Sequence, residues 1–197
     1  PIRGNELLSL WVLWLAGRVV MAVPFFSPLL SSIIDGAFLV VVAGLAWREI
    51  IAGKSWPQAP IGVLVSLYAC ANVLFHVWTL SNAETDSAER MGLALVLVLL
   101  SLIGGRVTSN FTRDFLAEQG RPEQPAPFSP VDGVSVVVVG IAALFWIVQP
   151  QALVTGWLWV AAGLLSLVRL LRWYGWLTWR EPLVLTLHVV FAWMVLA

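Results

Sequence analysis

The sequence predicts an all-α fold, a polytopic bundle of transmembrane helices, and three observations support this. Sixty per cent of the 197 residues are hydrophobic, only 11% are charged, and the mean hydropathy is +0.90. Soluble domains average about 45–50% apolar and about 25% charged residues, because their surfaces need charge. The apolar residues also fall into runs of about 20, the length a helix needs to cross the hydrocarbon core. A membrane barrel would show short alternating segments instead.

About seven such runs are expected to form helices, and the last is short for a membrane span. They cover residues 5–23, 29–51, 60–82, 88–107, 131–149, 152–172 and 182–197. Proline, glycine or polar residues, which favour turns, separate them at 24–28, 53–60, 82–86, 117–130 and 149–151. We expect a single transmembrane helical domain over 1–197. Because the chain starts with Pro1 and the last run gives only about 24 Å of helix, we expect a fragment of a larger protein.

Charge and cysteine content exclude several classes of protein. The 11 basic and 11 acidic residues cancel, so no nucleic-acid partner is expected. The one cysteine, Cys70, excludes a disulfide framework and a cysteine-rich metal cluster, and we expect it to be a small buried apolar residue. The expected partner of the chain is the lipid bilayer, and its oligomeric state is left open.

Basic residues predict the orientation of the chain in the membrane. Only Arg18 and Arg90 belong to the side opposite the N-terminus. The N-terminal side carries Arg3, Arg48, Lys54, Arg106, Arg113, Arg121, Arg169, Arg172 and Arg180. Loops rich in Lys and Arg stay in the cytoplasm, so the N-terminal side is predicted to be cytoplasmic.

Arg18 and Asp35 are expected to form an ion pair inside the membrane. Each lies about 8 Å below the outer interface, on two helices joined by a tight turn. An isolated charge in hydrocarbon costs several kcal/mol, and pairing offsets part of this cost. Trp11 and Trp14 share a helical face with Arg18 and could shield its guanidinium. The pair either stabilises the packing of the two helices or binds a cofactor carboxylate or a substrate.

A polar stripe follows one face of the third predicted helix. Tyr68, Asn72, His76 and Thr79 are spaced by four, four and three residues. Such a stripe should face protein or a water-filled cavity rather than lipid. His76 could bind a metal or haem, with Asn72 one turn away as its supporting partner. The alternative is a histidine hydrogen-bonded between helices.

The second histidine, His188, lies about six residues inside the last predicted helix and has the same two interpretations. It is about 15 Å from His76 in depth, because roughly ten residues separate their positions along the membrane normal. The two axial ligands of one haem lie at a similar depth, so the two histidines are expected to belong to separate sites.

Two arginines are candidates for binding an anion at the inner interface. Arg106 and Arg113 are seven residues apart and share a helical face, so they either extend to lipid headgroups or capture an anionic group. Ser101, Gly105 and Thr108 form a face of small residues, which favours close helix packing.

The sequence contains no catalytic motif. It has neither a phosphate-binding glycine loop nor a Ser-His-Asp arrangement, so an enzymatic activity is left open and is not favoured. Two other classes remain beside a cofactor-binding protein. One is a transporter whose path follows the stripe on the third helix, and the other is a structural or assembly subunit of a respiratory complex.

Several stretches, taken together, resemble the NnrS family of bacterial membrane proteins. In order, they are residues 13–18 (LWLAGR), Asp35, residues 71–76 (ANVLFH), 104–107 (GGRV), 111–113 (FTR), 180–188 (REPLVLTLH) and 191–193 (FAW). The chain departs from the family pattern at 108–110 (TSN), where the helix end is uncertain, and at Val190 and Phe191, which replace a Gly-Tyr pair.

The resemblance implies a membrane protein of about twelve helices that contains haem and copper and acts in the response to nitric oxide or protection from it. It implies that the chain lies in the bacterial cytoplasmic membrane, with nitric oxide as a ligand. It marks as family positions, without saying which histidine binds which cofactor, Arg18, Asp35, His76, Arg106, Arg113 and His188. The expected haem or copper ligands are His76 and His188.

Overall fold

The computed structural model describes residues 4–196, which are almost entirely helical and contain no strand. The predicted all-α fold is therefore confirmed. The α-helices are α1 (Asn5–Ala22), α2 (Pro28–Ala52), α3 (Ala59–Leu80), α4 (Asp86–Leu99), α5 (Gly105–Glu118), α6 (Pro130–Val148), α7 (Leu153–Leu171) and α8 (Pro182–Leu196). Shorter turns are η1 (Trp56–Gln58), η2 (Leu100–Gly104) and η3 (Gly175–Thr178).

Within residues 4–196, six helical segments are long and apolar enough to cross a membrane, and α8 is a shorter apolar helix. The fourth segment differs from its predicted end at residue 107. There, η2 is a π-helical turn that joins α4 to α5, and the helix continues as one run over Asp86–Glu118. The helix continues because Thr108, Ser109 and Asn110 each have a backbone N–H group. A proline at one of these positions would remove a hydrogen bond of the helix.

Capping residues set the starts of two helices. The Ser27 hydroxyl accepts a hydrogen bond from the backbone N–H of Leu30, and Pro28 occupies the first turn of α2. Ser129 and Asp132 form a capping box at the start of α6, where Pro130 again lies in the first turn. Proline favours this position because the first-turn N–H groups have no partner within the helix.

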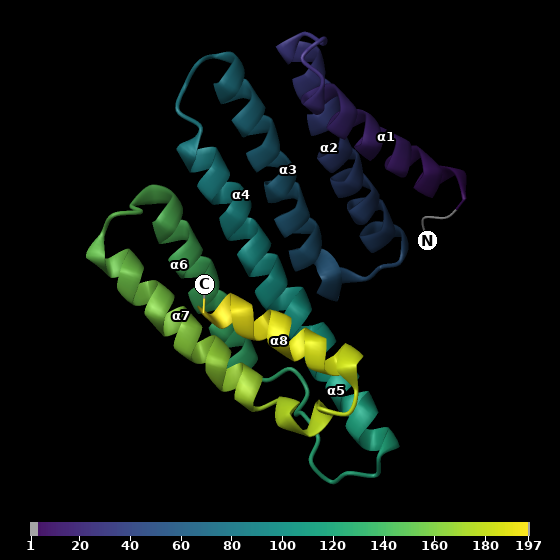
Figure 1. Cartoon of the computed structure of the whole chain (residues 1–197), viewed down its shortest axis with the longest axis vertical. Coiled ribbons are helices and arrows are strands. Elements are labelled where there is room, and N and C mark those ends of the chain that lie inside the picture. The colour runs from purple at the N-terminus through teal and green to yellow at the C-terminus, as the bar shows by residue number, and fades with distance from the viewer. Residues whose placement is uncertain (1–3, 197) are drawn as a thin grey trace. The chain divides into compact units, whose positions relative to one another are not determined.

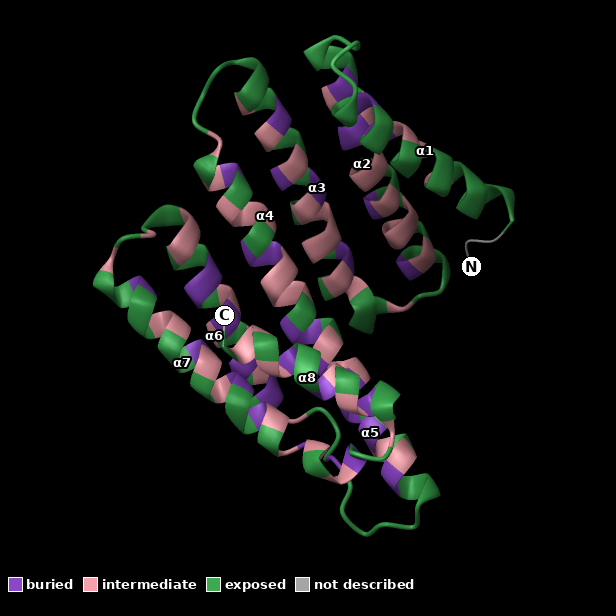
Figure 2. Cartoon of the chain, in the orientation of Figure 1, coloured by how far each residue is buried: buried purple, intermediate pink, exposed green. Residues whose placement is uncertain are grey.

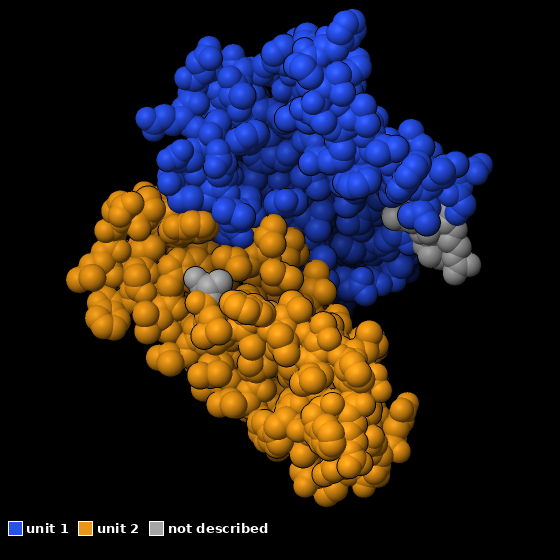
Figure 3. Space-filling view, in the orientation of Figure 1, with its two compact units in different colours: residues 1–95 blue, residues 96–197 orange. Residues whose placement is uncertain are grey.

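The chain divides into two compact units, residues 1–95 and 96–197, shown in two colours in Figure 3. In the first unit, α2 packs between α1 and α3, as the ribbons in Figure 1 show. In the second unit, α7 packs against α6 and α8, while α5 and η3 also contact α8. Each unit therefore has its own set of helix contacts, within which its polar residues are positioned.

Buried residues form narrow stripes on otherwise exposed apolar helices, as the colouring of Figure 2 shows. Large side chains such as Leu153, Trp157 and Trp193 are exposed, which suits helices that face lipid or other helices. The expectation for Cys70 is wrong, because its side chain is exposed. It lies two positions before Asn72 on α3 and so points away from the polar stripe.

Candidate functional site

The first unit brings Arg18 of α1 against Asp35 of α2. The guanidinium Nη2 of Arg18 forms an ion pair with the carboxylate Oδ1 of Asp35. Asp35 is buried, whereas 56% of the Arg18 side chain is exposed. Gly17 permits this approach, because a Cβ there would lie 3.3 Å from the Cα of Asp35. The pair therefore lies next to a close approach of the two helices.

The other carboxylate oxygen of Asp35 contacts two residues of α3. Its Oδ2 is 3.0 Å from His76 Nε2 and accepts a longer hydrogen bond, 3.4 Å, from Asn72 Nδ2. An ionised carboxylate only accepts hydrogen bonds, so His76 donates its Nε2–H and its Nδ1 carries the lone pair when the ring is neutral. The sequence had suggested Asn72 as the supporting partner of His76. In the structure, Asn72 donates to Asp35, which in turn contacts His76.

These residues line a pocket with a volume of about 460 Å³. Its polar wall consists of Arg18, Asp35, Asn72 and His76. Its other lining residues are Trp14, Met21, Phe38, Leu39, Tyr68 and Phe75. An apolar and aromatic pocket with a few converging polar groups is typical of a cofactor or small-molecule site.

The polar stripe on α3 contributes to this pocket only in part. Tyr68, Asn72 and His76 line it, whereas Thr79 is exposed and its hydroxyl donates to the backbone carbonyl of Phe75 within the same helix. Trp14 lines the pocket, while Trp11 is an exposed residue outside its lining. Three of the four residues of the stripe therefore line the pocket, and the fourth does not.

In the second unit, His188 of α8 is buried and contacts α5. Its Nε2 is 2.8 Å from the hydroxyl oxygen of Thr112. The same hydroxyl donates to the backbone carbonyl of Thr108, at 2.7 Å. His188 Nδ1 is buried and lacks a hydrogen-bond partner within residues 4–196. The two histidines thus lie in different units, each with its own oxygen partner.

Arg106 and Arg113 both reach the loop that follows α5. The Arg106 guanidinium carbon lies 5.1 Å from the centroid of the Phe128 ring, a cation–π geometry. Arg113 Nε donates to the backbone carbonyl of Pro125, at 3.2 Å. Both arginines therefore contact residues within the chain, and they help to position this loop.

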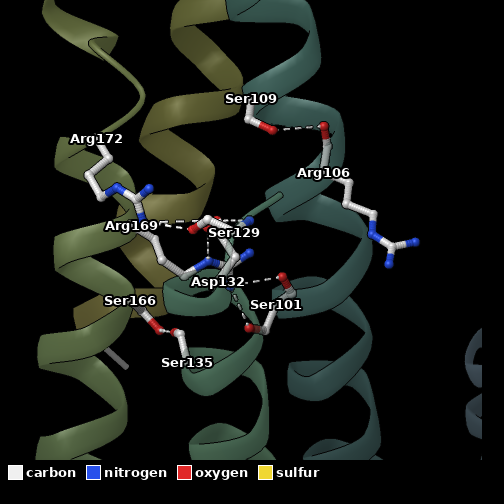
Figure 4. Close-up of polar contacts among 9 residues, drawn as sticks. All are labelled: Ser101, Arg106, Ser109, Ser129, Asp132, Ser135, Ser166, Arg169 and Arg172. Carbon is white, nitrogen blue, oxygen red and sulfur yellow. Dashed lines mark hydrogen bonds and ion pairs between the residues drawn. The ribbon is translucent and has the colours of Figure 1, made fainter. Parts of the chain in front are cut away.

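A cluster of polar contacts around the buried Arg169, which the sequence did not reveal, joins α6 and α7 (Figure 4). Arg169 is 1% exposed, and its Nε donates to Asp132 Oδ1, at 3.0 Å. Its Nη1 donates to both the carbonyl and the hydroxyl oxygen of Ser101, at 3.2 and 3.1 Å. Its guanidinium carbon also lies within 6 Å of two aromatic ring centroids, those of Trp173 and Phe191. This arginine therefore ties four helical segments together.

The sequence had placed Arg169 among the interfacial charges of the cytoplasmic side. Gly105 makes room for it, because a Cβ at that position would overlap the guanidinium. Arg172, one turn further on, donates from Nη1 to the Ser129 hydroxyl, at 3.0 Å. One signal could have identified the cluster. Asp132 lies in the first turn of α6 and Arg169 in the last turn of α7, so the two residues lie at the same end of a helical hairpin.

Fold and site together define a multi-pass helical membrane protein with buried histidine sites. A family model described as NnrS protein matches residues 1–197, and the chain belongs to that family. Comparison with curated proteins and with solved structures finds no match.

Proposed function

We propose that this chain is part of a haem- and copper-containing protein of the bacterial cytoplasmic membrane that protects the cell against nitric oxide. Membership of the NnrS family supports the proposal, and so does one structural observation. Asp35 fixes the His76 imidazole on the wall of an aromatic pocket whose other polar residues include Arg18.

This pocket offers one histidine as a ligand for a haem iron or a copper ion, and residues 4–196 contain no group of three or more histidine, cysteine, aspartate or glutamate side chains that would hold a metal by itself. A histidine that binds a metal through one nitrogen commonly donates the other N–H to a carboxylate, which fixes the orientation of the ring. Asp35 accepts from His76 in this way, leaving Nδ1 as the candidate ligand atom. Asn72 Oδ1 is buried and without a hydrogen-bond partner in the described part of the chain, so it could accept one from a bound group.

Arg18 adds a cation to the pocket. Its side chain is half-exposed, and a guanidinium has further N–H donors beyond the one that contacts Asp35, which suit an anionic group such as a cofactor carboxylate. A haem with an open coordination position binds nitric oxide, whereas one with two histidine ligands transfers electrons. Besides His76, the chain has one other histidine as a candidate metal ligand, His188.

The decisive experiment compares three forms of the protein purified in detergent from cells supplied with haem. Reduced-minus-oxidised absorbance spectra and the iron and copper contents are measured for the wild type, His76→Ala and Thr79→Ala. The last variant is the matched control, because Thr79 lies on the same helix outside the pocket. We expect the wild type and control to show the same haem band, and His76→Ala to lose most of it.

Two outcomes would contradict the proposal. If the wild type contains neither haem nor copper, the cofactor assignment is wrong, and a structural subunit becomes the better description. If His76→Ala retains the full haem and copper content of the wild type, the pocket of the first unit is not the cofactor site.

A further inference from the structure

The segment that joins α7 to α8 carries two exposed tryptophans on one face. Trp176 and Trp179 are 57% and 64% exposed. They lie three residues apart, and η3 (Gly175–Thr178), which contains the first and ends at the second, is a 3₁₀ turn. Such a turn has three residues per turn, so side chains spaced by three residues lie one above the other. Both indoles therefore belong to the same side of the segment.

The opposite side of the segment is packed against the protein. Trp173 is 3% exposed, and Thr178 is fully buried and donates from its hydroxyl to the Gly175 carbonyl, at 2.7 Å. The ring of Tyr174 contacts that of Trp176 in a T-shaped arrangement, with 5.5 Å between the centroids. The segment is thus held by its buried residues and presents the two indoles on its exposed side.

Arg180 adds a cation to this exposed side. Its guanidinium carbon lies 4.8 Å from the centroid of the Trp179 ring, a cation–π geometry. Within residues 4–196, the exposed Arg180 side chain forms no ion pair and no hydrogen bond, not even with the neighbouring Glu181. An aromatic ring therefore positions this cation, and no carboxylate in the described structure neutralises it.

The polar groups of these three side chains are all hydrogen-bond donors. The indole N–H groups of Trp176 and Trp179 have no acceptor in the part of the chain that the structure describes. The Arg180 guanidinium has five N–H donors in a planar fork that fits a phosphate. The surface therefore suits a ligand with a negative charge, several acceptor oxygens and an apolar part that contacts the rings.

The position of the segment along the membrane normal indicates which ligand this is. Helix α7 has 19 residues and is about 28 Å long, close to the thickness of the hydrocarbon core. The residues after its end are then at the level of the lipid headgroups, where tryptophan is enriched. The predicted orientation places this end on the cytoplasmic side, where the membrane surface is negatively charged.

We propose that Trp176, Trp179 and Arg180 form a binding site for one anionic phospholipid. The guanidinium binds the phosphate of the headgroup, and the indoles lie beside the glycerol esters, whose oxygens accept from the indole N–H groups. This inference goes beyond the proposed function and does not depend on a cofactor. It gives the connection between α7 and α8 a defined lipid contact.

The site is tested by native mass spectrometry on the whole protein in detergent, titrated with phosphatidylglycerol or with phosphatidylcholine of the same acyl chains. We expect the wild type to bind one phosphatidylglycerol more tightly than phosphatidylcholine. Arg180→Gln should lower the affinity for phosphatidylglycerol about three- to tenfold, the contribution of one basic residue at an anionic lipid surface, and affect phosphatidylcholine less. Arg121→Gln is the matched control, because Arg121 is also exposed in the second unit and has no ring contact in the described structure.

Trp176→Leu tests the contribution of the indoles, because it removes one ring and one donor and keeps the contact between Arg180 and Trp179. We expect it to weaken the binding of both lipids about two- to tenfold. Equal affinities of the wild type and Arg180→Gln for phosphatidylglycerol would overturn the proposal. A wild type that does not prefer phosphatidylglycerol would also overturn it.

Inorganic phosphate distinguishes a lipid site from a site for a free anion. It is added at constant ionic strength and at concentrations comparable with that of the lipid. We expect phosphatidylglycerol to stay bound, because inorganic phosphate has no apolar part to contact the indoles. Displacement of the lipid under these conditions would show that the site recognises the anion alone, and the lipid assignment would be wrong.

Discussion

Asp35 uses both carboxylate oxygens, and this determines the chemistry of the pocket around it. One oxygen pairs with Arg18 and the other accepts from His76 and Asn72. A carboxylate held by one cation and two further donors is compensated even though it is buried. Its removal would therefore affect the ion pair and the orientation of His76 together.

The Arg18–Asp35 pair should show strong coupling in a double-mutant cycle. We expect Arg18→Leu to lower the free energy of unfolding in detergent by about 1–3 kcal/mol, because it leaves a buried carboxylate without its cation. Arg18→Leu combined with Asp35→Leu should cost less than the sum of the single changes. The matched control is Arg48→Leu, whose pair with Glu6 is exposed to solvent and should contribute little to stability. Additive effects at Arg18 and Asp35 would show that the pair does not stabilise the fold.

In the second unit, an ion pair between Asp132 and Arg169 joins the start of α6 to the end of α7. Asp132 lies in the first turn of α6 and Arg169 in the last turn of α7, so an antiparallel hairpin brings them together. The π-helical turn η2 contributes Ser101, which accepts from Arg169 through its carbonyl and its hydroxyl. Through this ion pair and these hydrogen bonds, Arg169 connects α6, α7 and η2.

Asp132→Asn should destabilise this hairpin more than loss of a neutral contact does. The variant leaves the Arg169 guanidinium buried without its counter-charge, a change that costs about 3–5 kcal/mol. Ser166→Ala, which removes only the 3.4 Å contact with the Ser135 hydroxyl, should cost at most about 1.5 kcal/mol. Thermal or denaturant unfolding in detergent measures both. Equal effects of the two substitutions would contradict a stabilising role for the charge.

At the scale of the whole molecule, the chain is a series of apolar helices whose polar groups are gathered into two units. Each unit contains one buried histidine with an oxygen partner, His76 with Asp35 and His188 with Thr112. The loops differ in charge, because basic residues concentrate on the side of the N-terminus. This asymmetry predicts how the protein lies in the membrane.

Single cysteines can test the predicted orientation in intact bacterial spheroplasts. In a Cys70→Ser background, we expect Ala83→Cys, in the loop after α3, to react with a membrane-impermeant maleimide. Ala126→Cys, in the loop after α5, should react only after the membrane is permeabilised. The two positions are both exposed, so access to the reagent differs only by the side of the membrane. The reverse pattern of labelling would show the N-terminal side to be outside.

The sequence by itself determined the helical class, most helix boundaries and the pairing of Arg18 with Asp35. Hydrophobic run length predicts spans because the membrane sets the length of a helix that crosses it. The depths of Arg18 and Asp35 followed from the rise per residue, since a tight turn joins their helices. Asn72 and His76 were expected to share a helical face, because their spacing of four residues brings them one above the other.

Only the tertiary structure decided which partners meet across helices that are distant in sequence. Thr112 and His188 are 76 residues apart, and Ser101 and Arg169 are 68 apart, so no local periodicity relates them. The burial of Arg169 was hidden for the same reason, because a charge near a helix end is usually interfacial. A polar side chain is buried against a polar partner only where the helices pack so that the two meet. That packing is a property of the folded chain.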